Sequence, residues 1–396
     1  MNVTTKISDA HNAEVLIERA RTLVPALRQR AAQTNAARQL PSETIADYQR
    51  LGLTRCLQPA MFGGANSNYH VFSKMLRVLA QGCGSSAWVA AVHGEHSWIV
   101  GNFPLEAQHE MWDGNPYAVA SASVAPNGTA ERVDGGGFRL SGRWGFASGV
   151  DHAQWILLGA MLKGSGAPEP WMFLLPIGAV EIIDDWHVMG LAGTGSKSVT
   201  CKDVMVPAPR GVSLRDLKRG TAPGGKVHAD NPLFRTPRHM LALFSLSSVV
   251  VGLAERSVAE LVEFNRERRS RGQRVADLES IQLMVAEASA LADAAALMGE
   301  HTIESNIRLV ASGAEITPLD ITRSRRNASY TARLAHSAVK LIFEAAGGTA
   351  LQLSNPLQEI LRDVTAGTSH VSITWNRAAV YDGQVRLGVP VDIDMV

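Results

Sequence analysis

The spacing of apolar residues changes twice along this chain. From about residue 10 to 110 they recur every three or four positions with charges between them, as in AEVLIERARTLVPALRQRAAQ, which predicts amphipathic helices. After residue 117 the apolar runs become short or alternating and are bounded by Gly, Pro and Asn, a pattern typical of β-strands joined by hairpins. From about residue 240 to 385 long, Ala-rich helical patterns return, and they suit the close packing of a bundle.

These changes predict an α+β protein with three parts. We expect an N-terminal helical domain over residues 1–116, a central β-barrel or sandwich domain over 117–220, and a C-terminal four-helix bundle over 221–396. Within the β domain, RVDGGGFRLSG (132–142) predicts a glycine-rich turn between two strands, and VEIIDDWHVMG (180–190) predicts a further strand.

Composition narrows the class of protein. The 396 residues are 46% hydrophobic and 19% charged, an ordinary globular balance, and the net charge of +1 gives no basic field for nucleic acid or an anionic membrane. The apolar stretch near 240–253 is short and serine-rich, so it predicts a buried helix and no membrane span. No signal peptide is visible, and Cys56, Cys83 and Cys201 lack metal or disulfide spacing, so we expect a cytoplasmic protein with reduced thiols.

The stretch RWGFASGVDHAQW (143–155) is unusual. It alternates like a strand, but Ser148 and Gly149 interrupt it, and on the residues alone a β-bulge is the favoured interpretation. Asp151 and His152 are adjacent and would point to opposite faces of a strand, so a supporting role is expected for both.

Two other motifs invite functional interpretations that we reject. His93 and His96 share a helix face, but HEXXH spacing and a third ligand are missing, so no metal site is predicted. GTGSKS (193–198) lacks the spacing of a phosphate-binding loop and its strand–helix context.

Several ordered motifs resemble a known superfamily. WHVMGLAGTGSKSVTCKDVMVP (186–207) and LRDVTAGTSHVS (361–372) are similar to segments of the acyl-CoA dehydrogenase superfamily. RWGFASGVDHAQW, AVASASVAPNG (118–128) and the position of His370 after Asp363 resemble more closely the oxygenase components of two-component flavin-dependent monooxygenases, such as those acting on p-hydroxyphenylacetate and phenolic secosteroids.

This resemblance implies a monooxygenase that receives reduced FMN, with FAD as the alternative, from a separate NAD(P)H:flavin reductase. It would react with O2 through a C4a-hydroperoxyflavin, oxygenate a small phenol- or indole-like aromatic substrate, and form a homotetramer. The alternatives are an acyl-CoA dehydrogenase with bound FAD and a helical binding protein without chemistry. A dehydrogenase commonly places its glutamate base where this chain has Ala366, which argues against that alternative.

The resemblance also suggests site residues. Ser148 would lie beside flavin N5, while His370 would accept the proton of a substrate hydroxyl and His96 would contact the substrate. The predicted cofactor-binding set is Trp88, Ser123, Phe146, Ala147, Ser148, Arg268, Gly348 and Thr349, the last three across a subunit boundary. The predicted substrate-binding set is His96, Ala122, His239 and His370, of which Ala122 and His239 depart from the phenol hydroxylases.

Overall fold

Five helices precede the first strand. The computed structural model describes residues 3–164 and 166–395. The helices of this part are α1 (Val3–Ala37), α2 (Ser42–Leu51), α3 (Tyr69–Ala80), α4 (Gly84–Val100) and α5 (Leu105–Trp112). Almost every residue of α4 is buried, because this helix lies between the other helices and the sheet. Its polar side chains therefore need partners inside the protein.

The central part is a single seven-stranded sheet with the order β5-β6-β2-β1-β3-β4-β7. The strands are β1 (Ala120–Arg132), β2 (Phe138–Ala147), β3 (Trp155–Lys163), β4 (Glu169–Pro176), β5 (Glu181–Ile183), β6 (Lys197–Val206) and β7 (Gly211–Ser213). The predicted turn between β1 and β2 is confirmed, with three consecutive glycines at positive φ. Not every connection is a hairpin, because β1 and β3 pair in parallel.

The prediction of a strand over residues 180–190 is mostly wrong. Only β5 forms, and the chain after it is irregular. Side chains hold this irregular segment in place: Arg38 forms an ion pair with Asp184, and Asp185 accepts a hydrogen bond from the backbone N–H of Ser198. Polar residues that looked like the exposed face of a strand instead make these specific bonds.

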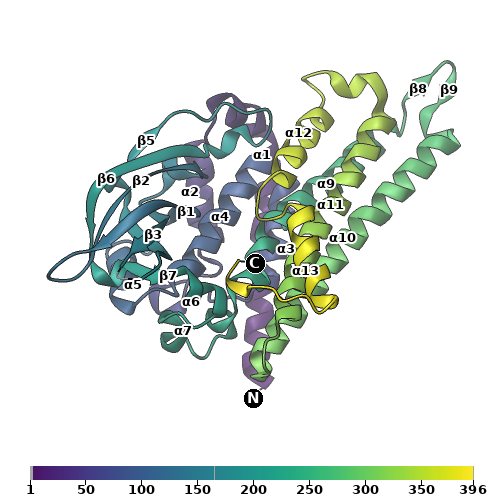
Figure 1. Ribbon diagram of the computed structural model, residues 1–396. Helices are drawn as coiled ribbons and strands as arrows, with labels where there is room; N and C mark the ends of the chain where they lie inside the picture. Colours follow the sequence, from purple (N-terminus) through teal and green to yellow (C-terminus); the bar gives the residue numbers. More distant parts are fainter. Residues whose placement is uncertain (1–2, 165, 396) are drawn as a thin grey trace.

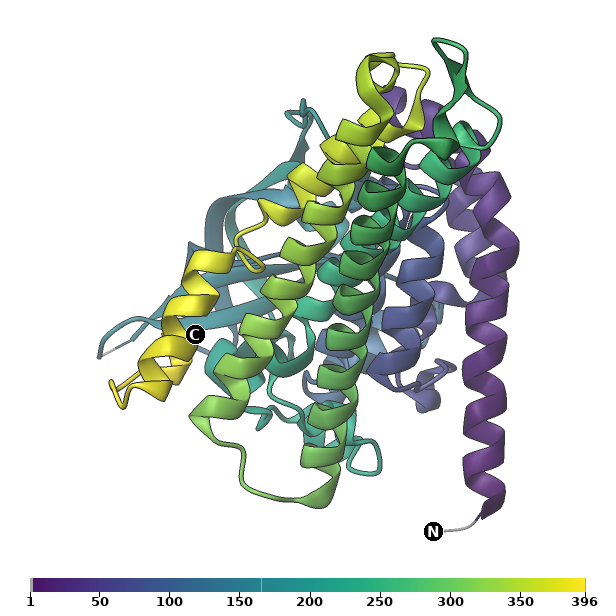
Figure 2. The ribbon, with the colours of Figure 1, turned by 90° about the vertical axis from the view of Figure 1, so that its right-hand side faces the viewer.

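Long helices form the C-terminal part (Figures 1 and 2). Short helices α6 (Leu214–Arg219), α7 (Gly224–Val227) and α8 (Arg238–Leu241) lead into α9 (Leu243–Asn265). A small hairpin, β8 (Arg269–Ser270) and β9 (Gln273–Arg274), precedes α10 (Glu279–Ser312), α11 (Pro318–Ala346), α12 (Pro356–Thr368) and α13 (Trp375–Arg386). The α+β fold is therefore confirmed, while the boundaries at 116/117 and 220/221 stay predictions.

Two of these helices are long and apolar enough to cross a membrane, but they differ in burial. The segment Arg238–Asn265, which contains α9, is 89% buried over its most apolar window, so it is the core helix that the sequence predicts. The corresponding window of α10 is only 17% buried. An apolar helix face left open in one chain marks a surface for another molecule.

Asp363 on α12 fixes the β domain against the bundle. Its Oδ1 accepts a hydrogen bond of 2.6 Å from the backbone N–H of Leu191, in the loop before β6. Gly84 at the start of α4 leaves room for this carboxyl, because a Cβ there would lie 2.6 Å from Oδ2. Burial raises the pKa of Asp363 to about 7. The loop 191–196 is thereby held where α4, α12 and the end of β2 meet.

Candidate active site

The stretch that interrupts the alternating pattern is a turn at the end of a strand. Strand β2 ends at Ala147, and a 3-10 helix begins at Val150. Phe146 has a φ of 62° and Gly149 a φ of 69°, and the N–H of Ser148 donates to the carbonyl of Phe146 at 2.9 Å. The β2–β6 ladder shifts register between Trp144 and Ala147, so a bulge-like irregularity is present, but it precedes Ser148 and Gly149, where the chain leaves the sheet.

Gly149 cannot be replaced without strain. Besides its positive φ, a Cβ on this residue would lie 2.6 Å from Nε2 of His93. That nitrogen is 3.1 Å from the carbonyl of Gly149, and the backbone N–H of Gly149 donates to the carbonyl of Thr194 at 2.8 Å. Burial lowers the pKa of His93 to about 4, so the ring is neutral and its one N–H serves this carbonyl. His93 therefore supports the turn.

A chain of three hydroxyl groups stands beside this turn. Oγ of Ser148 lies 2.7 Å from Oγ of Ser196, which lies 2.7 Å from Oγ1 of Thr194. The Thr194 hydroxyl donates to the carbonyl of Leu191, also at 2.7 Å. The hydrogens therefore run in one direction, from Ser148 to Ser196 to Thr194, and Ser148 keeps a lone pair with which to accept a hydrogen bond.

The loop 193–198, rejected as a phosphate-binding loop, thus contributes two residues that the predicted site lacked, Thr194 and Ser196. Its similarity to the superfamily segment was the available signal. An ion pair also ties this loop to the turn, because Nζ of Lys197 lies 2.7 Å from Oδ1 of Asp151. This contact agrees with the supporting role expected for Asp151.

An exposed aromatic ring lies next to the hydroxyl chain. The side chain of Phe146 is 70% exposed, and its ring centroid lies 5.8 Å from that of Trp186 in an edge-to-face arrangement. Ser123 on β1 donates to the carbonyl of Gly145, which holds the backbone before this ring. A large exposed apolar side chain beside ordered polar groups is typical of a binding surface for a planar molecule.

His96 faces the sheet from α4. Its Nδ1 lies 2.7 Å from the carbonyl of Ala120 on β1, so Nδ1 carries the hydrogen in the neutral ring and Nε2 is left as an acceptor. Burial, with smaller contributions from the charges of His93 and Arg238, lowers the pKa of His96 to about 3. Ala122, also predicted for the substrate, is buried two residues further along β1, on the same face as Ala120.

His370, in the loop after α12, has the opposite arrangement. Its Nδ1 accepts a hydrogen bond of 3.3 Å from the backbone N–H of Ser372, so Nε2 carries the hydrogen of the neutral ring. Burial lowers its pKa to about 4, and Arg238 again contributes. The ring packs edge-to-face on Trp88 of α4, with centroids 5.8 Å apart. Trp88 and His96 are on the same helix, so α4 brings both predicted histidines into one region.

Arg238, which directly precedes the predicted His239, has a defined place beside α4. Its Nη2 lies 3.1 Å from Oε1 of Glu95, which also accepts a hydrogen bond of 2.5 Å from the Ser245 hydroxyl. Glu95 is adjacent to His96 on α4, and the charge of Arg238 acts on both His96 and His370. The neighbouring His239, predicted for the substrate, is half-buried on α8.

The remaining predicted cofactor residues form a second group at the end of α9. Nη2 of Arg268 lies 3.4 Å from Oγ1 of Thr349, and its Nη1 lies 3.4 Å from the carbonyl of Ala346. A Cβ on Gly348 would meet open space. Nδ2 of the buried Asn265 has no hydrogen-bond partner in the part of the chain that the structure describes. This group lies beside the β8–β9 hairpin (Figure 1).

A dehydrogenase base is not evident in this region. Ala366 packs against the hydrophobic core and carries no carboxylate. The two buried carboxyl groups nearest in the fold, Glu95 and Asp363, are both engaged, the first with Arg238 and Ser245 and the second with the backbone of Leu191. Neither is free to abstract a proton from a thioester substrate.

Comparison with known proteins gives the family of this chain. Residues 244–375 match the family described as acyl-CoA dehydrogenase, C-terminal domain. The chain is 36% identical over 387 residues to the oxygenase component of the FADH(2)-dependent resorcinol hydroxylase of Rhizobium sp. (strain MTP-10005), covering 94% of each. The crystal structure of the 3-HSA hydroxylase from Rhodococcus sp. RHA1 is similar with a TM-score of 0.91 at 32% identity, covering 96% of this chain and 98% of that one.

The structure of XiaF from a Streptomyces species with FADH2 and glycerol, at 24% identity, shows the same fold with a TM-score of 0.91 and covers 98% of each chain. The fold and the sequence similarity together define the class: this protein is an oxygenase of the acyl-CoA dehydrogenase fold. More narrowly, it belongs to the oxygenase components of two-component flavin-dependent monooxygenases, enzymes that oxygenate aromatic compounds with reduced flavin supplied by a reductase.

Proposed function

We propose that reduced flavin binds with its ring system against the turn 146–149 and that the aromatic substrate lies between His96 and His370. The observation that carries this proposal is the pairing of the two histidines. Both are neutral at physiological pH, and one presents an acceptor nitrogen while the other presents a donor N–H. The acceptor nitrogen suits a substrate hydroxyl, and the donor N–H suits the oxygen atom that the substrate receives.

The residues present fit a flavin. Phe146 offers an exposed aromatic surface, and Ser148 has an oriented hydroxyl with a free lone pair. The N5–H of a reduced flavin is a donor, so it requires an acceptor, which the directed hydroxyl chain leaves on Ser148. When bound, the reduced flavin supplies the electrons that activate O2. The roles of Trp88, Ser123 and Ala147 in lining this ring are part of the same proposal.

The hydrogen bonds change the division of work between the histidines. Nε2 of His96 accepts the hydrogen bond, or the proton, of the substrate hydroxyl, which makes the aromatic ring a better nucleophile. The Nε2–H of His370 would donate a hydrogen bond to the oxygen atom that is transferred to the substrate. The sequence-based prediction gave the acceptor role to His370, whereas its hydrogen bond with Ser372 favours the donor role.

We further propose that the flavin phosphate is held by Arg268, Gly348 and Thr349 of a neighbouring subunit in a homotetramer. A guanidinium with weak bonds of 3.4 Å to its own chain can be reoriented toward phosphate oxygens. The open face of α10 carries exposed apolar residues such as Leu297, which other copies would cover. The three buried, unpaired cysteines support a cytoplasmic location.

The test is to supply photoreduced flavin and O2 to the purified protein with phenol and indole probes, and to measure oxygenated product against H2O2. FMN and FAD are compared at equal concentration, because the sequence favours FMN whereas the resorcinol hydroxylase is named for FADH2. Oxygenated product with little H2O2 supports the proposal. Immediate, stoichiometric H2O2 with every probe and both flavins would refute it.

A further inference from the structure

Four basic side chains meet where α6, α8, α11 and α13 approach one another. They are Lys218, Arg238, Arg325 and Arg377. Each lies near enough for its charge to act on others of the group: Arg238, Arg325 and Arg377 all lower the pKa of Lys218, which burial, the largest cause, brings to about 8. Like charges brought together inside a protein are unfavourable unless an anion compensates them.

Two carboxylates of the described chain approach this group, and both already have partners. Asp394 is held by Arg215 and Arg219 at 2.9 and 2.8 Å, and Glu95 by Arg238 at 3.1 Å. Lys218 also donates to the backbone carbonyl of Asp394. Neither carboxylate pairs with Arg325.

Arg325 is the exceptional member. Its side chain is only 5% exposed, and within residues 3–164 and 166–395 it makes no ion pair and its buried Nε has no hydrogen-bond partner. Its guanidinium carbon lies over the ring of Tyr381, 5.9 Å from the centroid. Burial, followed by the charge of Arg377, lowers its pKa to about 10, so the guanidinium is still charged at neutral pH. A buried charge without a partner is unfavourable, and binding of an anion removes this penalty.

Arg238 links this charge to the active site. Its Nη2 pairs with Glu95, next to His96 on α4, but its Nε is buried and has no hydrogen-bond partner in the described chain. In the described chain the buried Nε atoms of Arg238 on α8 and of Arg325 on α11 both lack a hydrogen-bond partner, and the charge of Arg238 acts on His96, His370 and Arg325. Such nitrogens are donors for the two oxygens of a carboxylate.

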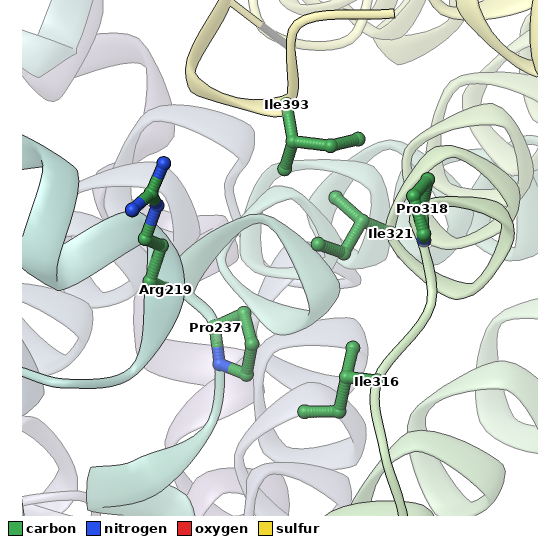
Figure 3. A pocket seen from close by; sticks show the side chains of 6 residues that line it. All are labelled: Arg219, Pro237, Ile316, Pro318, Ile321 and Ile393. Carbon is green, nitrogen blue, oxygen red and sulfur yellow. The ribbon is translucent and has the colours of Figure 1, made fainter.

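An open cavity of about 260 Å³ is lined by residues close in sequence to two of these arginines (Figure 3). Its wall includes Pro237, directly before Arg238, and Ile321, one helical turn before Arg325. The isoleucine and proline side chains in Figure 3 face a common apolar space, and Arg219 lies at its edge. The wall consists of Arg219, Pro237, Ile316, Pro318, Ile321 and Ile393. An organic anion approaching from solvent would meet an apolar wall and a basic end.

We propose that the aromatic substrate of this enzyme carries a carboxylate, which Arg325 binds together with Nε of Arg238 while the ring lies between His96 and His370. The proposal rests on the proposed substrate position and adds the chemical class of the substrate. It assigns Arg325 as a specificity-determining residue that does not touch the reacting atoms. Neutral phenols of the same shape would bind more weakly, because they leave the guanidinium uncompensated.

The test compares acids with their neutral amides. Calorimetry on the full-length protein without flavin measures the affinity for 4-hydroxybenzoate, 4-hydroxyphenylacetate and 3-(4-hydroxyphenyl)propionate, each beside its primary amide. At least one acid is expected to bind about 10-fold or more tighter than its amide, the range for hydrogen bonds to charged groups. If no acid is preferred in the unaltered protein, the proposal is wrong, and this result needs no variant.

Arg325→Gln is expected to bring the acid-to-amide ratio to about 1 without weakening the amide, and Arg325→Lys to retain part of the preference. The matched control is Arg323→Gln, on the same helix but paired with Asp320 at a partly exposed position; it keeps the original ratio. Arg325→Gln should also raise the Tm of the ligand-free protein, because it removes an uncompensated buried charge. A preference that survives in a folded Arg325→Gln protein overturns the proposal. Product formation from a neutral probe is measured separately, so this failure is distinct from failure of the proposed function.

Discussion

The two sides of the candidate site differ in how far their polar groups are satisfied. At the turn 146–149 three hydroxyls are bonded in series, from Ser148 through Ser196 and Thr194 to the carbonyl of Leu191. At the basic group, Arg238 and Arg325 keep buried nitrogens without partners in the described chain. The first side is ordered by bonds within the protein, whereas we propose that a ligand completes the second.

This difference separates two tasks. A satisfied network holds its atoms in place before the cofactor arrives, which is what positioning a flavin edge requires. An unsatisfied charge selects the molecule that neutralises it, which is what discrimination among aromatic substrates requires. The two histidines belong to the proposed substrate position. Four experiments test the difference between the turn and the basic group.

The largest effect is expected for His96→Ala. Loss of the acceptor nitrogen should reduce the rate of oxygenation about 10²–10⁴-fold, the usual contribution of a general base. Oxidation of reduced flavin by O2 should continue, with H2O2 replacing product. Product and H2O2 are measured together in single-turnover experiments. His370→Ala is the comparison: as the donor residue it should also impair formation of product, but adding a base such as imidazole should rescue His96→Ala alone. Equal rescue of both variants would contradict the assignment of acceptor and donor.

A fall in pH from 7 to 5 should destabilise the fold through His93 and His96. Both are neutral in the folded chain because burial lowers their pKa values to about 4 and about 3, whereas they titrate near 6.5 when unfolded. The unfolded chain therefore binds more protons in this interval, and stability falls with pH, by at most about 2 kcal/mol for each histidine. Asp363, whose pKa burial raises to about 7, acts in the opposite direction.

Urea denaturation at several pH values measures this slope. His93→Gln keeps a side-chain donor for the carbonyl of Gly149 and removes the titration, so its slope should be smaller than that of the unaltered protein. An unchanged slope would mean that His93 is not the buried neutral group described above.

Gly149→Ala should destabilise the protein by about 1–3 kcal/mol, the cost of a strained backbone conformation. The alanine would have to adopt the positive φ of this position, and its Cβ would lie 2.6 Å from Nε2 of His93. Thermal unfolding measures the effect. Gly178→Ala is the matched control, since Gly178 has no atom within 4 Å of a Cβ and no positive φ. Equal Tm values for the two variants would show that the turn adapts and is not preorganised.

Ser148→Ala should have the smallest effect on stability, about 1 kcal/mol for one lost hydrogen bond. Its functional effect should be a several-fold increase in H2O2 per product, because the acceptor beside the flavin is lost while the backbone of the turn stays. Ser289→Ala on α10, which removes a hydroxyl bonded only to the carbonyl of Val285, serves as the control. A Ser148→Ala protein that couples as well as the control would remove Ser148 from the site.

Sequence patterns predicted the larger elements well because burial and periodicity are local properties. The long period-3.6 stretches became α9, α10 and α11, and the glycine-rich turn joined β1 to β2. The segment 180–190 failed because its conformation depends on partners far away, such as Arg38 and Ser198. No local pattern carries that information.

Motifs in the sequence were enough to predict the fold class, the family and candidate residues such as Ser148, His96 and His370. How these residues are oriented depends on the folded chain. Hydrogen bonds to the carbonyl of Ala120 and from the N–H of Ser372 set which nitrogen of each histidine carries the hydrogen. Burial against helices distant in sequence left Arg325 charged and unpaired. Charge compensation and tautomer choice depend on three-dimensional neighbours, and these exist only once the chain has folded.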